Sequence, residues 1–319
     1  MLMARKCGGP RELFGYPDLW RRCRSASGCV HGRERKGEPQ VVYEAEIRRG
    51  QPTAILMLVD QSTSMNELMH SGRTKAQHVA DALNRTLQNL VIRCTRSDGV
   101  RDYFDVGVLG YGRDGVVNGF SGELGHGILH PLSSIYSTPL RIDERTVRED
   151  DGAGGILERK RRFPVWFEAK AAGTTPMVAA LQRAKEELQA WCDAHPASYP
   201  PTVLHFTDGE STDGDPSVVA AEIRVSLFTS DGPALLYNLH VSTGIGDAEV
   251  FPSSADGLDS PFARQLFAMS SVFTDAQIGL ARLKYPDIGE GARGFIFNAD
   301  AVHVIDFFDI GTRRVSEAE

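Results

Sequence analysis

The sequence lacks long hydrophobic runs. No segment reaches the ~18 consecutive apolar residues that a membrane-spanning helix needs. The first twenty residues also lack the apolar centre of a secretory signal. Hydrophobic residues make up 41% of the 319 residues and charged residues 24%, and this balance is typical of a globular protein with a sizeable core. We therefore predict a cytoplasmic protein without a membrane partner.

Cysteine is also scarce. The chain has five cysteines, an odd number that is scattered along its length. This distribution favours reduced thiols over a disulfide framework.

A positive net charge is lacking as well. The net charge is −7, but residues 1–36 carry +6, which leaves −13 for residues 37–319. Phosphate binding needs a positive surface, so the acidic body argues against nucleic acid as the main partner. Residues 1–40 are basic and rich in Arg and Gly, and we predict that they form a poorly ordered extension.

Strand-like and helix-like segments alternate after Pro39. The strand-like segments are residues 41–47, 54–60, 103–112, 165–169, 202–208, 234–242 and 294–298. The helix-like segments are residues 74–94, 176–191, 216–228, 262–271 and 299–308. Because most of the strands are apolar on both faces, we predict an α/β fold with a doubly wound, Rossmann-like, mostly parallel central sheet and helices on both faces.

One stretch interrupts this alternation. Residues 112–164 are rich in Gly, Ser and charge and show little periodicity. We predict one domain over residues 41–312 with an irregular insertion at residues 112–164, followed by a tail at residues 313–319.

Three polar loops belong to this pattern. Asp60-Gln61-Ser62-Thr63-Ser64 follows one strand, Gly173-Thr174-Thr175-Pro176 precedes a helix, and Asp208-Gly209-Glu210 ends another strand. Ligands of open α/β sheets bind beyond the carboxyl ends of the strands, so we expect the three loops to share one edge. Their carboxylates and hydroxyls are hard oxygen donors, which suit Mg²⁺ or Mn²⁺ better than structural zinc.

The spacing of Ser62 and Ser64 strengthens this prediction. Alternate residues of an extended loop point the same way, so both hydroxyls can face one ion. If neutral hydroxyls are the direct ligands and the carboxylates act partly through water, the ion keeps much of its positive charge. Such an ion attracts an acidic group from outside the chain.

These residues resemble a known family. Asp60-x-Ser62-x-Ser64, a later threonine before a helix, and Asp208-Gly209 resemble the metal-ion-dependent adhesion site (MIDAS) of von Willebrand factor A (vWA) domains, over roughly residues 50–310. The resemblance implies that Ser62, Ser64 and the threonine coordinate the metal, while Asp60 and Asp208 hold it directly or through water. It also implies that an Asp or Glu of a partner protein completes the octahedron, so that the function is binding and not catalysis.

The threonine has two candidates. The family's Gly-Thr-Pro pattern favours Thr175, which precedes Pro176, whereas Thr174 directly follows Gly173. We choose Thr175, although the threonine could also serve only as a helix cap.

A narrower resemblance concerns the segments LMLVDQSTSM (residues 56–65) and GARGFIFNADAVHVIDFFDIGT (residues 291–312). They look like bacterial cytoplasmic vWA proteins of the tellurium-resistance-associated (TerY) type. That resemblance implies a stress or signalling role beside Ser/Thr kinases or PP2C-like phosphatases. The long region 112–164 departs from a minimal A domain.

Two other functions remain open. A metal-dependent phosphatase would use Asp60 as phosphoryl acceptor, but Ser62 stands where a second carboxylate is expected. A scaffold would bind through the insertion or the basic extension, with a purely structural metal. We predict a metal-dependent protein-binding module and no enzyme. His205 lies inside a strand, and we predict a hydrogen-bonded core residue there.

Overall fold

The computed structural model describes residues 43–150, 156–243, 247–299, 303 and 307. The chain divides into a unit at Met1–Gln40 and a second unit at Val41–Glu319. The predicted basic extension and tail lie outside the described residues, and most of the predicted helix 299–308 does too. The domain boundaries therefore stay predictions.

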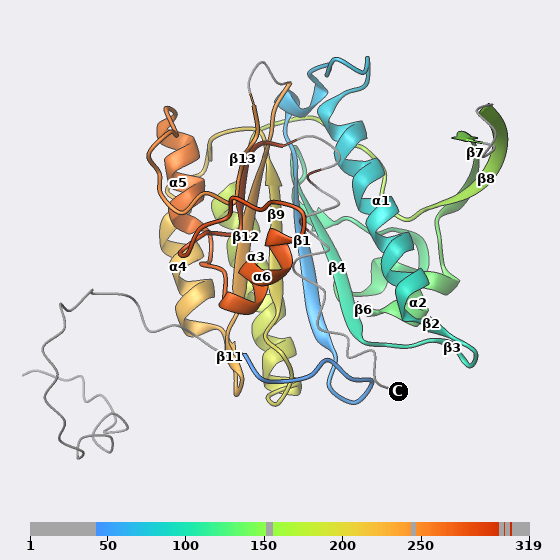
Figure 1. Cartoon of the computed structure of the whole chain (residues 1–319), viewed down its shortest axis with the longest axis horizontal. Coiled ribbons are helices and arrows are strands. Elements are labelled where there is room, and N and C mark those ends of the chain that lie inside the picture. The colour runs from blue at the N-terminus through green and yellow to red at the C-terminus, as the bar shows by residue number, and fades with distance from the viewer. Residues whose placement is uncertain (1–42, 151–155, 244–246, 300–302, 304–306, 308–319) are drawn as a thin grey trace, which may run out of the picture. The chain divides into compact units, whose positions relative to one another are not determined.

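An eight-stranded sheet forms the centre of the second unit (Figure 1). Its strand order is β13 (Glu249–Val250), β14 (Phe295–Ala299), β12 (Leu235–Val241), β9 (Thr202–Thr207), β1 (Thr53–Gln61), β4 (Phe104–Gly112) and β5 (Gly115–Asn118), and β6 (His130–Pro131) pairs with β4. The five strands from β14 to β4 run parallel to their neighbours. In contrast, β5 and β6 run antiparallel to β4, and β13 runs antiparallel to β14.

The fold-class prediction was wrong. The doubly wound, mostly parallel, Rossmann-like sheet is replaced by a mixed sheet in which three of eight strands are antiparallel. The reason at β5 is local, because a parallel return needs a crossover of about a dozen residues, whereas an antiparallel strand needs only a tight turn. Arg113 and Asp114 supply that turn, and Gly115 follows at φ 73°. The Asp-Gly pair is a hairpin signal that lies inside the stretch predicted as irregular.

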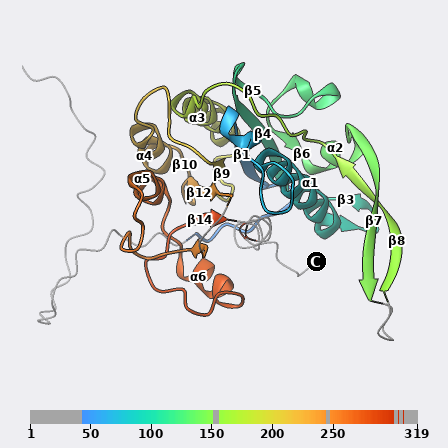
Figure 2. The same cartoon turned by 90° about the horizontal axis from the view of Figure 1, so that it is seen from above.

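The helices pack on the two faces of the sheet (Figure 2). α1 (Lys75–Cys94) and α6 (Asp275–Arg282) contribute to one apolar cluster, together with Ile55, Met57 and Val59 of β1. α3 (Met177–Ala194), α4 (Ser217–Ser226) and α5 (Pro261–Met269) contribute to the other, with Ala54, Leu56 and Leu58. Because side chains alternate along a strand, β1 is buried on both sides and joins the two cores.

Regular elements occupy much of the stretch predicted as an irregular insertion. The described residues there include α2 (Leu132–Ser137) and a hairpin of β7 (Arg141–Asp150) with β8 (Ile156–Val165). Two short antiparallel pairs also lie outside the main sheet: β2 (Thr95–Arg96) with β3 (Gly99–Val100), and β10 (Phe228–Thr229) with β11 (Gly232–Pro233).

The predicted strand 165–169 was wrong. Only Val165 belongs to a strand, and Trp166 and Phe167 continue as an extended segment with buried side chains. Asn84 of α1 replaces a sheet partner, since its Oδ1 accepts hydrogen bonds from the backbone N–H groups of Trp166 (2.8 Å) and Phe167 (3.0 Å). Its Nδ2 donates to the Phe167 carbonyl at 2.8 Å. A side chain therefore satisfies the backbone groups that a neighbouring strand would satisfy.

His205 is a buried core residue, as predicted. Its Nε2 lies 2.6 Å from the Tyr111 hydroxyl and its Nδ1 lies 2.8 Å from Asn238 Oδ1. Because Asn238 Oδ1 only accepts, Nδ1 carries the proton and Nε2 accepts from Tyr111. Burial lowers the pKa of His205 to about 4, and the hydrogen bond to Asn238 opposes this shift only in part.

The low pKa of His205 makes folding stability depend on pH. Below about pH 6.5 the unfolded chain protonates this histidine while the folded chain does not, so the free energy of unfolding falls as the pH falls toward 4. Between pH 7.5 and pH 5, we expect His205 to contribute a loss of about 2 kcal/mol. Urea titrations should show this loss as the difference in pH dependence between the native protein and His205→Gln.

The exposed His126→Gln variant is the control, because it removes a histidine that lies outside the core. Parallel pH profiles for the native protein and His205→Gln would contradict the prediction.

Candidate functional site

The carboxyl ends of β1 and β9 bring two of the three predicted loops together. These strands are parallel neighbours, and Val59 pairs with Phe206. Asp60 follows Val59, and Asp208 comes directly after β9. Ser62 and Ser64 lie in the turn of 3₁₀ helix that follows β1, while Thr175 lies just before α3. The expected common edge is therefore occupied by residues from all three loops.

Asp60 is fully buried, and both of its carboxylate oxygens are bonded. Oδ1 accepts a hydrogen bond from the Ser62 backbone N–H at 2.8 Å, and Oδ2 accepts one from the Thr207 hydroxyl at 2.8 Å. Burial raises the pKa of Asp60 to about 6; these hydrogen bonds oppose the rise, and the nearby Asp208 adds to it. The carboxylate is thus held in one orientation at the base of the site.

A chain of hydroxyls connects the first loop to Asp208. The Ser62 and Ser64 Oγ atoms lie 3.0 Å apart, and Ser64 Oγ donates to Asp208 Oδ1 at 2.7 Å. Four of the five predicted site residues therefore form one hydrogen-bonded chain, which runs from Asp60 through Ser62 and Ser64 to Asp208.

Thr175 lies beside this chain. A side chain added at Gly209 would place its Cβ 3.9 Å from both Ser64 Oγ and Thr175 Oγ1, so the two hydroxyls approach the same small space. Thr175 is buried, whereas Thr174 is exposed. Of the two threonines, Thr175 is the one enclosed with the other oxygen atoms.

Backbone contacts hold the first loop against the segment that leads to Thr175. The Thr63 N–H donates to the Gly173 carbonyl at 3.0 Å, and the Ala172 N–H donates to the Gln61 carbonyl at 2.7 Å. Gly173 has φ 86°, and a Cβ there would approach the Arg113 Cα to 2.4 Å. Only glycine fits this position, so the close approach of the two loops is built into the sequence.

Lys75 is a site residue that the sequence reasoning missed. Its buried Nζ donates to Asp208 Oδ2 at 2.9 Å and to Glu67 Oε2 at 2.6 Å. Burial alone would lower the pKa of Lys75, but the bonds to Glu67 and Asp208 outweigh it and the pKa is raised. Asp208 thus presents one oxygen to the Ser64 hydroxyl and the other to the ammonium group of Lys75.

The donor chemistry fits a hard divalent cation. The five predicted site residues offer oxygen atoms only, which are the ligands that Mg²⁺ and Mn²⁺ prefer. Within the described residues, no group of three or more His, Cys, Asp or Glu residues is placed to hold a metal ion. A cation here would depend on the hydroxyls of Ser62, Ser64 and Thr175 as well as on the two carboxylates.

Other acidic residues nearby have structural partners. Asp213 accepts hydrogen bonds from the backbone N–H groups of Val178 (3.0 Å) and Ala179 (2.9 Å) in the first turn of α3. Asp215 accepts from the Ser217 N–H at 2.9 Å, at the start of α4. These carboxylates cap helices, which accounts for their place in the sequence without a ligand.

Comparisons with known proteins give no family. No family model matches the chain, and no curated protein matches it. Among solved structures, the chain is similar to the pilus adhesin SpaC from Lactobacillus rhamnosus GG, with 12% identity and a TM-score of 0.43 over 86% of this chain and 32% of that one. It is also similar to the PilB minor pilin from Streptococcus sanguinis (13% identity, TM-score 0.30, 50% and 30% covered). A third match is the pilus adhesin RrgA from Streptococcus pneumoniae (16% identity, TM-score 0.26, 54% and 22% covered).

These findings correct the predicted family. The chain spans about a third or less of each of those proteins, and the likenesses are too distant to assign a function. The similar structures are pilus adhesins and a pilin, and no family model supports a vWA protein of the TerY type. The assignments to a vWA domain with a MIDAS, to a Rossmann-like protein and to stress signalling were therefore wrong.

Among the described residues, no helix has the length and apolar character needed to span a membrane.

Removal of the Lys75 charge should destabilise the protein even without a metal. The Asp208 side chain is fully buried, and Lys75→Met would leave its carboxylate without a cation. Breaking a buried ion pair from one side costs about 3 kcal/mol or more, so we expect a loss of this size in the free energy of unfolding. Urea denaturation in the presence of a chelator measures it.

Lys185→Met is the matched control, because the Lys185–Glu222 pair is 34% and 47% exposed and should contribute less than about 1 kcal/mol. Equal stabilities for the two variants would contradict the structural role of Lys75.

Proposed function

We propose that this chain is a protein-binding module whose recognition site is a divalent cation, Mg²⁺ or Mn²⁺, held by Asp60, Ser62, Ser64, Thr175 and Asp208. The observation that supports this most is the unbroken chain of oxygen atoms from Ser62 through Ser64 to Asp208, beside the buried Asp60. When bound, the cation supplies a positive charge to which an acidic side chain of a partner protein can bind.

The charges around the site favour an external acidic ligand. Only Asp60 and Asp208 supply negative charge to the enclosed group, and Lys75 already balances part of the charge of Asp208. A dication held by two carboxylates and neutral hydroxyls keeps an attraction for a third carboxylate, and the adjacent Lys75 adds to it. An Asp or Glu of a partner is therefore the ligand that this arrangement suits.

The arrangement of Asp60 gives less support to a phosphatase. A phosphoryl acceptor needs a carboxylate oxygen that substrate can reach, whereas Asp60 is buried and both of its oxygens accept hydrogen bonds. Ser62, two residues later, offers a hydroxyl and not a second carboxylate. We therefore propose a binding function and no enzymatic one.

The partner's identity is a separate matter. Association with Ser/Thr kinases or PP2C-like phosphatases and a cytoplasmic location stay predictions from the sequence. The site supports only the chemical class of the contact, which is a carboxylate on a protein.

Metal binding should stabilise the native protein and fail to stabilise Asp208→Ala. At a free Mg²⁺ or Mn²⁺ concentration of 100 times Kd, the gain for the native protein is about 2.7 kcal/mol. The gain is measured within each variant, by urea denaturation with the metal and with a chelator. Comparing each variant with itself removes the stability cost of the mutation. Asp208→Ala has such a cost because it leaves Lys75 without one of its two partners.

Asp215→Ala is the control, since this exposed aspartate follows the same loop and caps α4. It should retain the full gain. Calorimetric titration should show metal binding for the native protein and Asp215→Ala but not for Asp208→Ala. An equal gain in all three proteins, or none in the native protein, would refute the proposed site.

A further inference from the structure

A polar cleft of about 340 Å³ lies between α1, the β7–β8 hairpin and the segment that follows the hairpin. Its charged lining residues come from three parts of the chain. They are Arg73 and Asp81 at α1, Arg141 and Arg145 on β7, and Glu168 and Lys170 after β8. Four cations and two carboxylates line the cleft, and Asp143, which pairs with Arg141, adds a third carboxylate beside it. The body around it is acidic, since residues 37–319 carry a net charge of −13.

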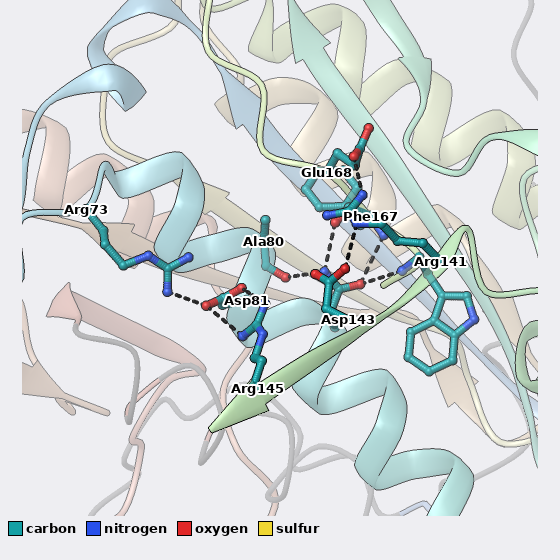
Figure 3. A network of polar contacts seen from close by, with 10 residues as sticks. Arg73, Ala80, Asp81, Arg141, Asp143, Arg145, Phe167 and Glu168 are labelled. Carbon is teal, nitrogen blue, oxygen red and sulfur yellow. Dashed lines mark hydrogen bonds and ion pairs between the residues drawn. The ribbon is translucent and has the colours of Figure 1, made fainter. Parts of the chain in front are cut away.

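Asp81 fixes two of the arginines. Arg145 Nη2 lies 2.9 Å from Asp81 Oδ1, and Arg73 donates to Asp81 Oδ2 (Figure 3). Burial would raise the pKa of Asp81, but the hydrogen bonds from Arg73 and Arg145 outweigh it and the pKa is lowered. Two guanidinium groups that share one ionised carboxylate leave one positive charge, held in a defined place.

Packing also holds the Arg145 side chain in place. Its guanidinium carbon lies 3.5 Å from the centre of the Phe163 ring, which is a cation–π contact across the hairpin. Phe163 and Val165 are buried, so this end of the hairpin is anchored to the body of the protein. The positive wall of the cleft is therefore preorganised, which lowers the entropic cost of binding.

Lys170 adds a charge that is not neutralised. It is exposed and makes no hydrogen bond or ion pair with the residues that the structure describes. Arg141, by contrast, is bound to Asp143 and Glu168. Lys170 is accordingly the cation most available to a ligand in the cleft.

Two walls of the cleft lie close along the chain to residues of the candidate metal site. On one wall, Arg73 lies two residues before Lys75, which binds Asp208. On the other, Lys170 leads through Gly173 to Thr175, five residues later. An extended chain covers at most about 17 Å in five residues, so the cleft and the site are within reach of one short peptide.

We propose that this cleft binds an acidic segment of the same partner protein whose Asp or Glu joins the cation. This inference rests on the proposed function, and it adds where the partner chain runs and what its composition is. The segment carries Glu or Asp residues about five positions from the residue at the metal. Its charge complements a cleft that keeps one positive charge in excess once Asp143 is counted, set in a protein whose overall charge repels long polyanions.

The test uses two fluorescent peptides that share one Asp and a four-residue Gly-Ser spacer. The spacer is followed by three Glu residues in the first peptide and by three Gln residues in the second. Fluorescence anisotropy with the full chain and Mg²⁺ should show binding of the Glu peptide that is about tenfold tighter than that of the Gln peptide. Lys170→Glu should remove this preference, and the milder Lys170→Gln should reduce it.

Arg49→Glu is the matched control, because Arg49 is exposed and precedes the amino end of β1, whereas the candidate site lies at the carboxyl end of that strand. It makes the same change of charge and should keep the tenfold preference. Calorimetric Mg²⁺ titration of all variants should give unchanged affinities, which shows that the cleft acts on the peptide and not on the metal.

The two proposals can fail separately. If Mg²⁺ binds as proposed but the Glu and Gln peptides bind alike, or neither binds at millimolar concentration, the cleft proposal is overturned and the metal site is not. If Mg²⁺ does not bind the native protein, the metal site is overturned. A Glu preference that persists in chelator and is lost in Lys170→Glu would then support the cleft alone.

Discussion

The parallel register between β1 and β9 is the constraint on which the site depends. Val59 lies beside Phe206, so the next residues, Asp60 and Thr207, are placed for the hydrogen bond that orients the buried carboxylate. A slip of one residue would turn Asp60 to the opposite face of the sheet and separate it from Thr207. Burial of β1 on both faces opposes such a slip, because every apolar side chain of the strand would exchange cores. The register that packs the two cores is therefore also the register that sets the geometry of the site.

The central elements could be predicted from the sequence because their apolar patterns are strong. The run over residues 54–60 corresponds to β1, the helical spacing over residues 74–94 corresponds to α1, and residues 202–208 correspond to β9. The positions of Asp60 and Asp208 follow from these elements. Each carboxylate comes where a buried parallel strand ends, and that relation is visible in the sequence alone.

The antiparallel parts could not be predicted in the same way. β7 contains alternating charges without an apolar face, and its packing depends on Arg145 over the Phe163 ring and on Asp81, which is 64 residues away. The short strands β5, β6 and β13 are too brief to carry a periodicity. Their direction is set by turns and by neighbouring strands, and it decides whether the sheet is parallel or mixed.

Lys75 was missed for a related reason. A lysine in the first turn of a helix is usually solvated, and nothing beside it in the sequence indicates burial. Its environment comes from Asp208, 133 residues away, which only the fold brings near. The oxygen atoms of the candidate site could therefore be predicted from the sequence, but not the charge that balances them.

The short strands at the two borders of the main sheet affect how copies of this protein can associate. β13 has two residues and β5 has four, so along its described borders the sheet offers few free backbone groups to a strand from another molecule. Sideways growth from these borders of the main sheet, into fibrils or strand-exchanged dimers, is thereby disfavoured. Contacts at the loops that follow the strands, and at the cleft beside α1, depend instead on side chains, which differ from one protein to another, and not on the backbone, which is common to all chains.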